Sequence, residues 1–338
     1  MIKFLKEHWI LVFALFLLVM MSLPMLYYGN LALDQRIQRG TANFRFAQHP
    51  EIGICLNSLM ESKWIKEKTI WLKEAKQRNL AIQIKIAHDS LQRQIEQINS
   101  LINQKVKVLI IVPVSRSGLE NVLQEAARQG VKIIFYEEIC DGPADLFIGL
   151  DYRTVGKMQA EMVTQKGGAG NYVVFRGPKD SYQAEMLYQG QMGVMKKAPQ
   201  YKVQAVEVLN NWSAEDAVLK LRTIITHQRL TAVIAPNDLI AGEIAKFLKE
   251  QKFPIPYLTG SGGDNSAYQR LKTEEQFLTV YYDYRSMAQT VLAYAAMLSR
   301  GRPVSAQPLP AAPGRKLPCR LFPAYLVTNS NLDSYQNR

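Results

Sequence analysis

The fold is decided by residues 106–136, which read VKVLIIVPVSRSGLENVLQEAARQGVKIIFY. Two runs rich in Val and Ile, at 106–114 and 131–136, stand on either side of an amphipathic stretch. Apolar residues at successive positions are typical of strands buried on both faces. Strands that alternate with helices form parallel sheets with right-handed crossovers. This stretch therefore predicts an α/β fold.

The same alternation extends from residue 51 to residue 330. Ser90 and Ser213 stand just before amphipathic stretches, where helix N-caps are expected. The segment 324–330 predicts a terminal strand, whereas the proline-rich and basic segment 300–323 predicts a loop or crossing linker. The further strand-like runs form two series, 52–56, 81–87 and 146–150, then 171–175, 201–209, 231–235, 257–261 and 277–282.

These runs predict two lobes. About ten strands are too many for one compact sheet, and the pattern divides near Asp151. We predict two doubly wound parallel-sheet lobes joined by a hinge. Because ligands in such folds bind at the carboxyl ends of strands, two facing lobes predict a cleft. The predicted bounds are 51–151 plus 283–305 for the N-terminal lobe and 152–282 plus 306–330 for the C-terminal lobe, with hinges near 151–153, 282–285 and 306–325.

An apolar segment precedes the lobes. We predict that residues 1–33 form a membrane anchor or signal segment. Within it, residues 9–28 read WILVFALFLLVMMSLPMLYY, without a charged side chain. About twenty residues reach roughly 30 Å as a helix, enough to cross a bilayer. No small-residue cleavage site follows the run. The sequence therefore favours an uncleaved single-pass transmembrane helix over a cleaved signal.

The net charge of +12 raises the possibility of an anionic partner. The basic residues are scattered along amphipathic segments, and anchorage beside anionic lipid headgroups explains the excess equally well. A DNA-binding repressor of this fold class carries a helix-turn-helix where this chain has its apolar run. No nucleic-acid partner is expected.

Groupings that suggest catalysis have simpler structural interpretations. His88, Asp89 and Ser90 are adjacent at a strand-to-helix turn, where Asp and Ser cap a helix, whereas the members of a triad converge from separate segments. The glycine-rich stretch 260–264 lacks the Gly-Lys-Ser/Thr ending of a phosphate loop. Four histidines and three cysteines show no metal-ligand spacing. The sequence predicts no enzyme, no metal and no cofactor.

Several segments together resemble the type I periplasmic binding proteins, in particular the xylose- and ribose-binding proteins of sugar ABC transporters. The resemblance covers residues 51–330. It implies a small sugar or polyol ligand, held by polar side chains at strand ends and by aromatic rings, and it implies that the lobes lie outside the cytoplasm at the cell membrane. It is carried by 106–136, GNYVVFRGPKDSYQAEMLYQGQM (170–192), NNWSAEDA (210–217), TAVIAPNDLIAGEIAKFL (231–248), TGSGGDNSAYQRL (259–271) and LTVYY (278–282).

Four residues of the C-terminal lobe match ligand positions of that family. The resemblance implies that Asn237 and Asp264 hydrogen-bond the ligand, that Trp212 stacks on it, and that Gln183 takes the place of an asparagine common in the xylose group. The alternative for Asn237 and Asp264 is helix capping.

Other matched positions carry changed residues. Lys63–Trp64 replaces Arg-Trp, Glu137–Glu138 replaces Asp-Arg after a tyrosine, and Tyr282 replaces a lysine. Lysine keeps the charge of arginine but loses its bidentate geometry. A buried carboxylate at Glu138 has to be protonated, paired or turned to solvent. These changes imply a ligand other than xylose, such as another sugar, an amino sugar or a polyol, or a partial loss of binding.

The expected function is a receptor that closes on its ligand by hinge motion and signals to a membrane partner such as a histidine kinase. The alternative is the substrate-binding component of a sugar ABC transporter, which works with a permease. A sugar-responsive repressor and an enzyme are less favoured.

Overall fold

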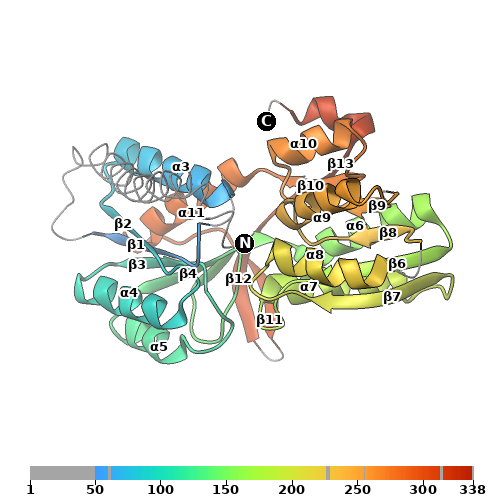
Figure 1. Cartoon of the computed structure of the whole chain (residues 1–338). Helices are drawn as coiled ribbons and strands as arrows, with labels where there is room; N and C mark the ends of the chain where they lie inside the picture. The colour runs from blue at the N-terminus through green and yellow to red at the C-terminus, as the bar shows by residue number, and fades with distance from the viewer. Residues whose placement is uncertain (1–49, 60–61, 226–228, 255, 313–314, 337–338) are drawn as a thin grey trace, which may run out of the picture. The chain divides into compact units, whose positions relative to one another are not determined.

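The computed structural model describes residues 50–59, 62–225, 229–254, 256–312 and 315–336, and its strands form two sheets (Figure 1). The first sheet has the order β11-β12-β5-β4-β3-β1-β2, and the second has the order β13-β10-β9-β8-β6-β7. The strands of the first sheet are β1 (Ile52–Leu56), β2 (Ile82–Ile86), β3 (Val108–Ile111), β4 (Lys132–Tyr136), β5 (Leu146–Leu150), β11 (Gln307–Ala312) and β12 (Arg315–Phe322). Those of the second are β6 (Gly170–Arg176), β7 (Tyr201–Val208), β8 (Ala232–Ile234), β9 (Tyr257–Thr259), β10 (Leu278–Tyr282) and β13 (Ala324–Thr328).

Helices cover both faces of the first sheet. Figure 1 shows α3 (Ser62–Arg78) and α11 (Tyr284–Leu298) on one face, and α4 (Leu91–Asn103) and α5 (Glu120–Arg128) on the other. Ser90 caps α4 as predicted, since its hydroxyl accepts from the N–H of Arg93 at 3.3 Å. The central strands β1, β3 and β5 are buried at every position, as their unbroken apolar runs require.

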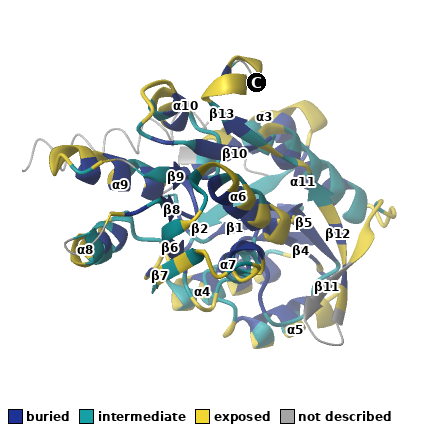
Figure 2. Cartoon of the chain, turned by 90° about the vertical axis from the view of Figure 1, so that its right-hand side faces the viewer, coloured by how far each residue is buried: buried dark blue, intermediate teal, exposed yellow. Residues whose placement is uncertain are grey.

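The second sheet is also covered on both faces. Tyr172 and Val174 of β6 pack in one hydrophobic cluster, whereas Val173 and Phe175 pack in another. Figure 2 shows the buried strands between helices whose outer faces are exposed. The helices of this lobe are α6 (Tyr152–Gly167), α7 (Tyr182–Met195), α8 (Ala214–Ile225), α9 (Asp238–Glu250) and α10 (Asn265–Lys272), followed by the 3₁₀ helix η1 (Asn329–Ser334).

Residues 306–322 were predicted to be a loop or crossing linker that belongs to the C-terminal lobe, and this prediction was wrong. The structure places β11 and β12 in the first sheet, where residues 319–322 of β12 pair in parallel with residues 147–150 of β5. The two strands form an antiparallel hairpin in which Pro308 stands opposite Pro318. Proline is tolerated in edge strands and disfavoured in central ones. A hairpin at the edge of a sheet can therefore contain several prolines, and its composition is then the same as that of a loop. Only residues 324–328 join the second sheet, antiparallel to β10.

The chain passes between the lobes at three places. These connections follow β5, β10 and β12, and lie at residues 151, 283 and 323. The first two fall at the predicted hinges, and the third lies within the predicted range 306–325. Among the described residues no helix has the length and apolar character needed to cross a bilayer. The apolar segment 9–28, for which a transmembrane helix is predicted, lies outside the described residues.

Two glycines fix how α6 packs on α7. A Cβ atom on Gly156 would lie 2.1 Å from the carbonyl oxygen of Leu187, and one on Gly190 would lie 2.0 Å from that of Arg153. No real Cβ approaches a backbone oxygen so closely, so the two helices touch backbone to backbone only because both positions are glycine. This contact holds α7, and the loop before it, next to the first crossing.

Candidate functional site

The predicted site residues follow the carboxyl ends of strands in both sheets. In the first lobe Lys63 and Trp64 lie in the first turn of α3, after β1, and Glu137 and Glu138 follow β4. Tyr282 is the last residue of β10. The remaining residues stand in the second lobe, with Gln183 at the start of α7, Trp212 after β7, Asn237 after β8 and Asp264 after β9.

Left-handed backbone conformations gather at these strand ends. His88 and Asp89 after β2 have φ of 50° and 58°, Glu137 after β4 has 59°, and Asn211 and Trp212 after β7 have 48° and 58°. Such conformations are uncommon for residues with a side chain and persist where the surroundings hold them. Five such residues thus stand in strand-end loops, and four others, Asn79, Lys105, Lys252 and Glu274, follow helices.

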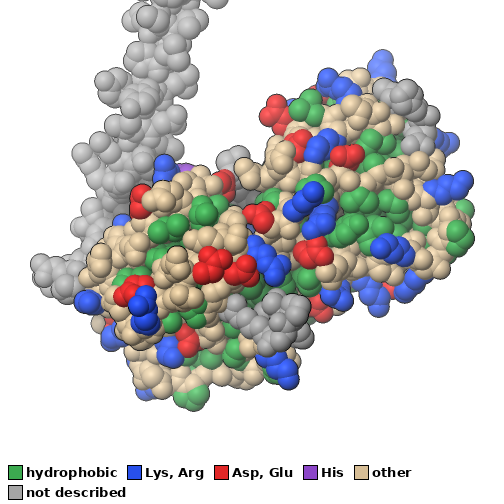
Figure 3. All heavy atoms as spheres, turned by 90° about the horizontal axis from the view of Figure 1, so that it is seen from below, with side chains coloured by type: hydrophobic (Ala, Val, Ile, Leu, Met, Phe, Trp, Pro, Cys, Tyr) green, Lys and Arg blue, Asp and Glu red, His purple; other side chains and the backbone are tan. Residues whose placement is uncertain are grey.

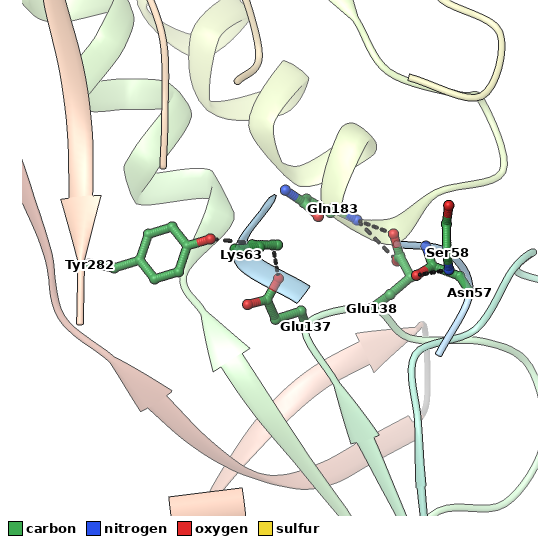
Figure 4. A network of polar contacts seen from close by, with 7 residues as sticks. All are labelled: Asn57, Ser58, Lys63, Glu137, Glu138, Gln183 and Tyr282. Atoms are coloured by element: carbon green, nitrogen blue, oxygen red, sulfur yellow. Dashed lines mark hydrogen bonds and ion pairs between the residues drawn. The ribbon is translucent and has the colours of Figure 1, made fainter. Parts of the chain in front are cut away.

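Lys63 links both lobes. Its ammonium pairs with the carboxylate of Glu137 and donates to the hydroxyl of Tyr282 at 3.2 Å (Figure 4). It also lies 4.5 Å from the ring centroid of Trp64, a cation–π contact. The Lys63 and Glu137 side chains are 16% and 2% exposed. Four predicted residues thus meet in one cluster, and the charge of Lys63 is balanced by Glu137.

Buried phenols surround this ion pair. Trp64 and Trp71 both pack edge-on against Tyr136, with ring centroids 6.1 and 5.8 Å apart. Burial raises the pKa of Tyr136 well above its ordinary value, and the carboxylates of Glu67 and Glu137 add to the shift. The pKa of Tyr152 is likewise raised by burial and by Glu137. Both phenols therefore keep their protons and offer hydroxyl groups, not negative charge.

Glu138 is paired across the lobes, one of the three outcomes expected for it. Its carboxylate accepts from the hydroxyl of Ser181 at 2.6 Å. It also accepts from the backbone N–H of Gln183 at 3.1 Å (Figure 4). Burial raises its pKa from 4.5 to about 7, although these hydrogen bonds oppose the shift. Ser181 was not identified from the sequence as a site residue. The sequence around Ser181 indicates only a helix N-cap, and an N-cap gives no information about a partner in the other lobe.

Two second-lobe candidates act as helix caps. The side chain of Asn237 accepts from the N–H of Ile240 at 2.9 Å, and that of Asp264 accepts from the N–H of Ala267 at 2.7 Å. A capping oxygen has further lone pairs, so capping leaves the predicted ligand role open. Trp212 lies against Gly177, where a Cβ atom would stand 2.5 Å from the indole ring.

Sequence reasoning missed Asp238, the neighbour of Asn237. It is 3% exposed and accepts from the N–H of Gly263 and the hydroxyl of Thr279, both at 2.7 Å, and from the amide of Gln276 at 2.8 Å. Burial raises its pKa from 3.8 to about 6. Asp238 thereby ties the start of α9 to the loop that carries Asp264.

The described residues hold no group of three or more His, Cys, Asp or Glu side chains that fits a metal ion. On the face shown in Figure 3, Lys and Arg side chains are interspersed with Asp and Glu, and no continuous basic surface forms there. What the strand-end clusters offer is a set of hydrogen-bond donors and acceptors between two lobes. Such a set suits binding of a hydroxyl-rich molecule.

Comparison with known proteins identifies the family. The family model described as a periplasmic binding protein domain matches residues 52–303. The chain belongs to this family. The predicted two-lobed α/β fold and the predicted family are thereby confirmed.

The relatives of this periplasmic binding protein are sugar-binding proteins by name. The D-xylose-binding periplasmic protein of Escherichia coli (strain K12) is 27% identical over 293 residues, covering 85% of this chain and 89% of that protein. The multiple sugar-binding periplasmic receptor ChvE of Rhizobium radiobacter is 25% identical over 280 residues, covering 74% and 78%. The chain is therefore a type I member of the periplasmic binding protein family, and these relatives are binding proteins by name, not enzymes.

Solved structures share the fold of this periplasmic binding protein. The Caulobacter myo-inositol binding protein bound to myo-inositol has a TM-score of 0.75 at 19% identity, covering 86% of this chain and 96% of that one. An ABC transporter solute binding protein from Clostridium phytofermentans with bound β-D-glucose has a TM-score of 0.76 at 22% identity, covering 84% and 95%. At these identities the likeness concerns the fold.

Proposed function

We propose that this chain is an extracytoplasmic receptor that binds one uncharged sugar or polyol between its lobes. The observation that carries the proposal is the cluster of Lys63, Glu137 and Tyr282, in which strand-end side chains of both sheets meet. The xylose- and multiple-sugar-binding names of the relatives support the ligand class. Hinge motion at the three crossings would let contacts to both lobes favour a closed state.

The charge of the cluster favours an uncharged ligand over an amino sugar. The Lys63 ammonium pairs with Glu137, the carboxyl group of Glu67 beside Tyr136 is 0% exposed, and the raised pKa of Glu138, about 7, leaves that group partly neutral. A ligand that brings its own charge would have to be desolvated beside groups that are already paired. Hydroxyl groups donate and accept without adding charge.

Titration calorimetry of the full chain tests this proposal. The panel is D-xylose, D-glucose, xylitol, myo-inositol and D-glucosamine. We expect at least one uncharged compound to bind and D-glucosamine to bind more weakly than D-glucose. Lys63→Met should weaken binding, whereas Lys132→Met, in an exposed ion pair with Asp145, should not. A folded protein that binds none of the five, or that prefers D-glucosamine, would contradict the proposed ligand class.

We propose delivery of the ligand to an ABC permease as the role of the receptor, since the solved relatives include ABC transporter solute binding proteins. The uncharged segment 9–28 favours a second candidate, a receptor held at the membrane that signals to a partner such as a histidine kinase. N-terminal sequencing of the mature protein separates them. An intact Met1 in the membrane fraction supports the held receptor, and a new N-terminus beyond residue 28 excludes a retained anchor.

A further inference from the structure

Tyr152 is a buried tyrosine directly after the first crossing between the lobes. It is the first residue of α6, it is 3% exposed, and its side chain belongs to the hydrophobic core. The backbone N–H of Glu137 donates to the carbonyl of Ile148 at 2.8 Å, so the turn that carries Glu137 lies beside the strand that leads to Tyr152. Tyr152 and Glu137 therefore stand at the carboxyl ends of two neighbouring strands, β5 and β4.

The hydroxyl group of Tyr152 has no hydrogen-bond partner within the part of the chain that the structure describes. Burial of an unpaired hydroxyl costs free energy, and phenylalanine would fill the same space without that cost. The pKa of Tyr152 is raised by burial and by Glu137, and it is lowered by Lys63. Its hydroxyl therefore lies within electrostatic reach of the ion pair that Figure 4 shows.

The second crossing offers a comparison, because the sequence Asp-Tyr-Arg occurs at both 151–153 and 283–285. Each aspartate caps the helix that follows, with φ and ψ of −77° and 82° at the first crossing and of −79° and 81° at the second. Tyr284 is only partly buried, and the ammonium of Lys66 lies 5.7 Å from the centroid of its ring. Both tyrosines begin a helix in the same way, so the start of a helix does not account for the buried hydroxyl at position 152.

We propose that the Tyr152 hydroxyl binds the ligand, as the donor of a hydrogen bond to a hydroxyl group of the sugar or polyol beside the Lys63–Glu137 pair. This inference rests on the proposed function and adds a ligand contact that the resemblance to the family did not imply. Because its pKa is raised, Tyr152 keeps its proton and can donate. A ligand hydroxyl accepts this bond and still has a proton to donate to a neighbouring carboxylate, whereas an ammonium group accepts no hydrogen bond and leaves Tyr152 unpaired. Tyr152 thereby selects for a hydroxyl group at this position of the ligand.

Three substitutions of tyrosine by phenylalanine in the full chain test the proposal. Tyr152→Phe removes only the hydroxyl that the proposal assigns to the ligand. Tyr284→Phe is the matched control at the second crossing. Tyr172→Phe removes a hydroxyl of the second lobe that donates to the carbonyl of Gly168 at 2.5 Å. Each variant is titrated in a calorimeter with D-xylose, D-glucose, xylitol and myo-inositol, and its thermal unfolding in mild detergent is followed by circular dichroism without any sugar.

We expect Tyr152→Phe to weaken binding of the sugar or polyol roughly tenfold and to leave the melting temperature unchanged or higher. The first effect follows from the lost hydrogen bond, and the second from removal of a buried hydroxyl that pairs with none of the described residues. Tyr284→Phe should change neither quantity. Tyr172→Phe should lower the melting temperature by about 2–4 °C and leave the affinity unchanged, because its hydroxyl has a partner in the chain.

Two results for Tyr152→Phe would overturn the proposal. One is an unchanged affinity in the folded variant. The other is a failure to fold, or a loss of melting temperature as large as that of Tyr172→Phe, which would show that the hydroxyl is paired within the protein and not by the ligand. Failure of the proposed function gives a different result, in which none of the four compounds binds the unsubstituted protein, and this inference then fails with it.

Discussion

The ion pair of Lys63 and Glu137 should be worth more to stability than any exposed pair, and Lys63→Met measures this. The substitution keeps most of the apolar stem and removes the ammonium, while the carboxylate of Glu137 stays 2% exposed. Loss of one member of a buried pair costs about 3–5 kcal/mol. Lys63 retains 16% exposure and the Tyr282 hydroxyl stays near the site, so we expect about 2–4 kcal/mol.

A double-mutant cycle makes this test specific. Glu137→Gln removes the other charge of the pair, and the double variant has neither member of the pair, so its cost should fall short of the sum by about 2 kcal/mol. Urea unfolding of the full chain in mild detergent, followed by tryptophan fluorescence, supplies the free energies of unfolding. Lys132→Met is the control, because Lys132 and Asp145 are 49% and 33% exposed and their pair should contribute less than about 1 kcal/mol. Additive costs, or a Lys63→Met cost no larger than that of Lys132→Met, would refute the reasoning.

Three further predictions concern packing, pH and positioning. Gly190→Ala should cost about 2–3 kcal/mol in thermal unfolding, because its Cβ would meet a backbone oxygen of α6, whereas Gly193→Ala on the same helix meets nothing and should not destabilise. The raised pKa of Glu138 means that the unfolded chain ionises first, so stability should fall between pH 4.5 and about 7. Relative to Glu138→Gln, the unsubstituted protein should lose on the order of 1–3 kcal/mol over that range; parallel pH profiles would contradict this. Asp238→Asn should cost about 2–3 kcal/mol, because an amide cannot accept from Gly263, Thr279 and Gln276 together, and denaturation at pH 7.5 checks it.

The two lobes were predictable from the sequence because buried parallel strands and amphipathic helices leave different periodicities. The hairpin of β11 and β12 was not, because its prolines have the composition of a linker. The hairpin belongs to the first sheet because β12 pairs with β5, and these two strands are far apart in the chain. Local composition carries no information about which distant edge a strand joins.

The candidate site also contains residues that the sequence predicts and residues that it does not. Lys63, Glu137 and Tyr282 came from the resemblance alone, since the partners of Lys63 lie 74 and 219 positions away. The capping of Asn237 and Asp264 followed from their place before helices, and the structure confirms it. Asp238 and the contact of Ser181 with Glu138 left no recognisable signal. Each works through a partner in another strand-end loop, and the register between such loops is set by tertiary packing.

The loops at the carboxyl ends of the strands therefore carry both the candidate site and contacts between the lobes. The loops after β3 and β4 carry Ser115 and Glu138, which hydrogen-bond residues of the second lobe, beside Glu137, which pairs with Lys63 in the candidate site. Glu137 and Glu138 are neighbours, so we expect a substitution at either position to disturb both sets of contacts. Glu137 has a left-handed backbone, with φ of 59°, and its carboxylate pairs with Lys63, while the carboxylate of Glu138 accepts from the N–H of Gln183 at the start of α7. The turn after β4 thus places one carboxylate in the candidate site and the other against the second lobe.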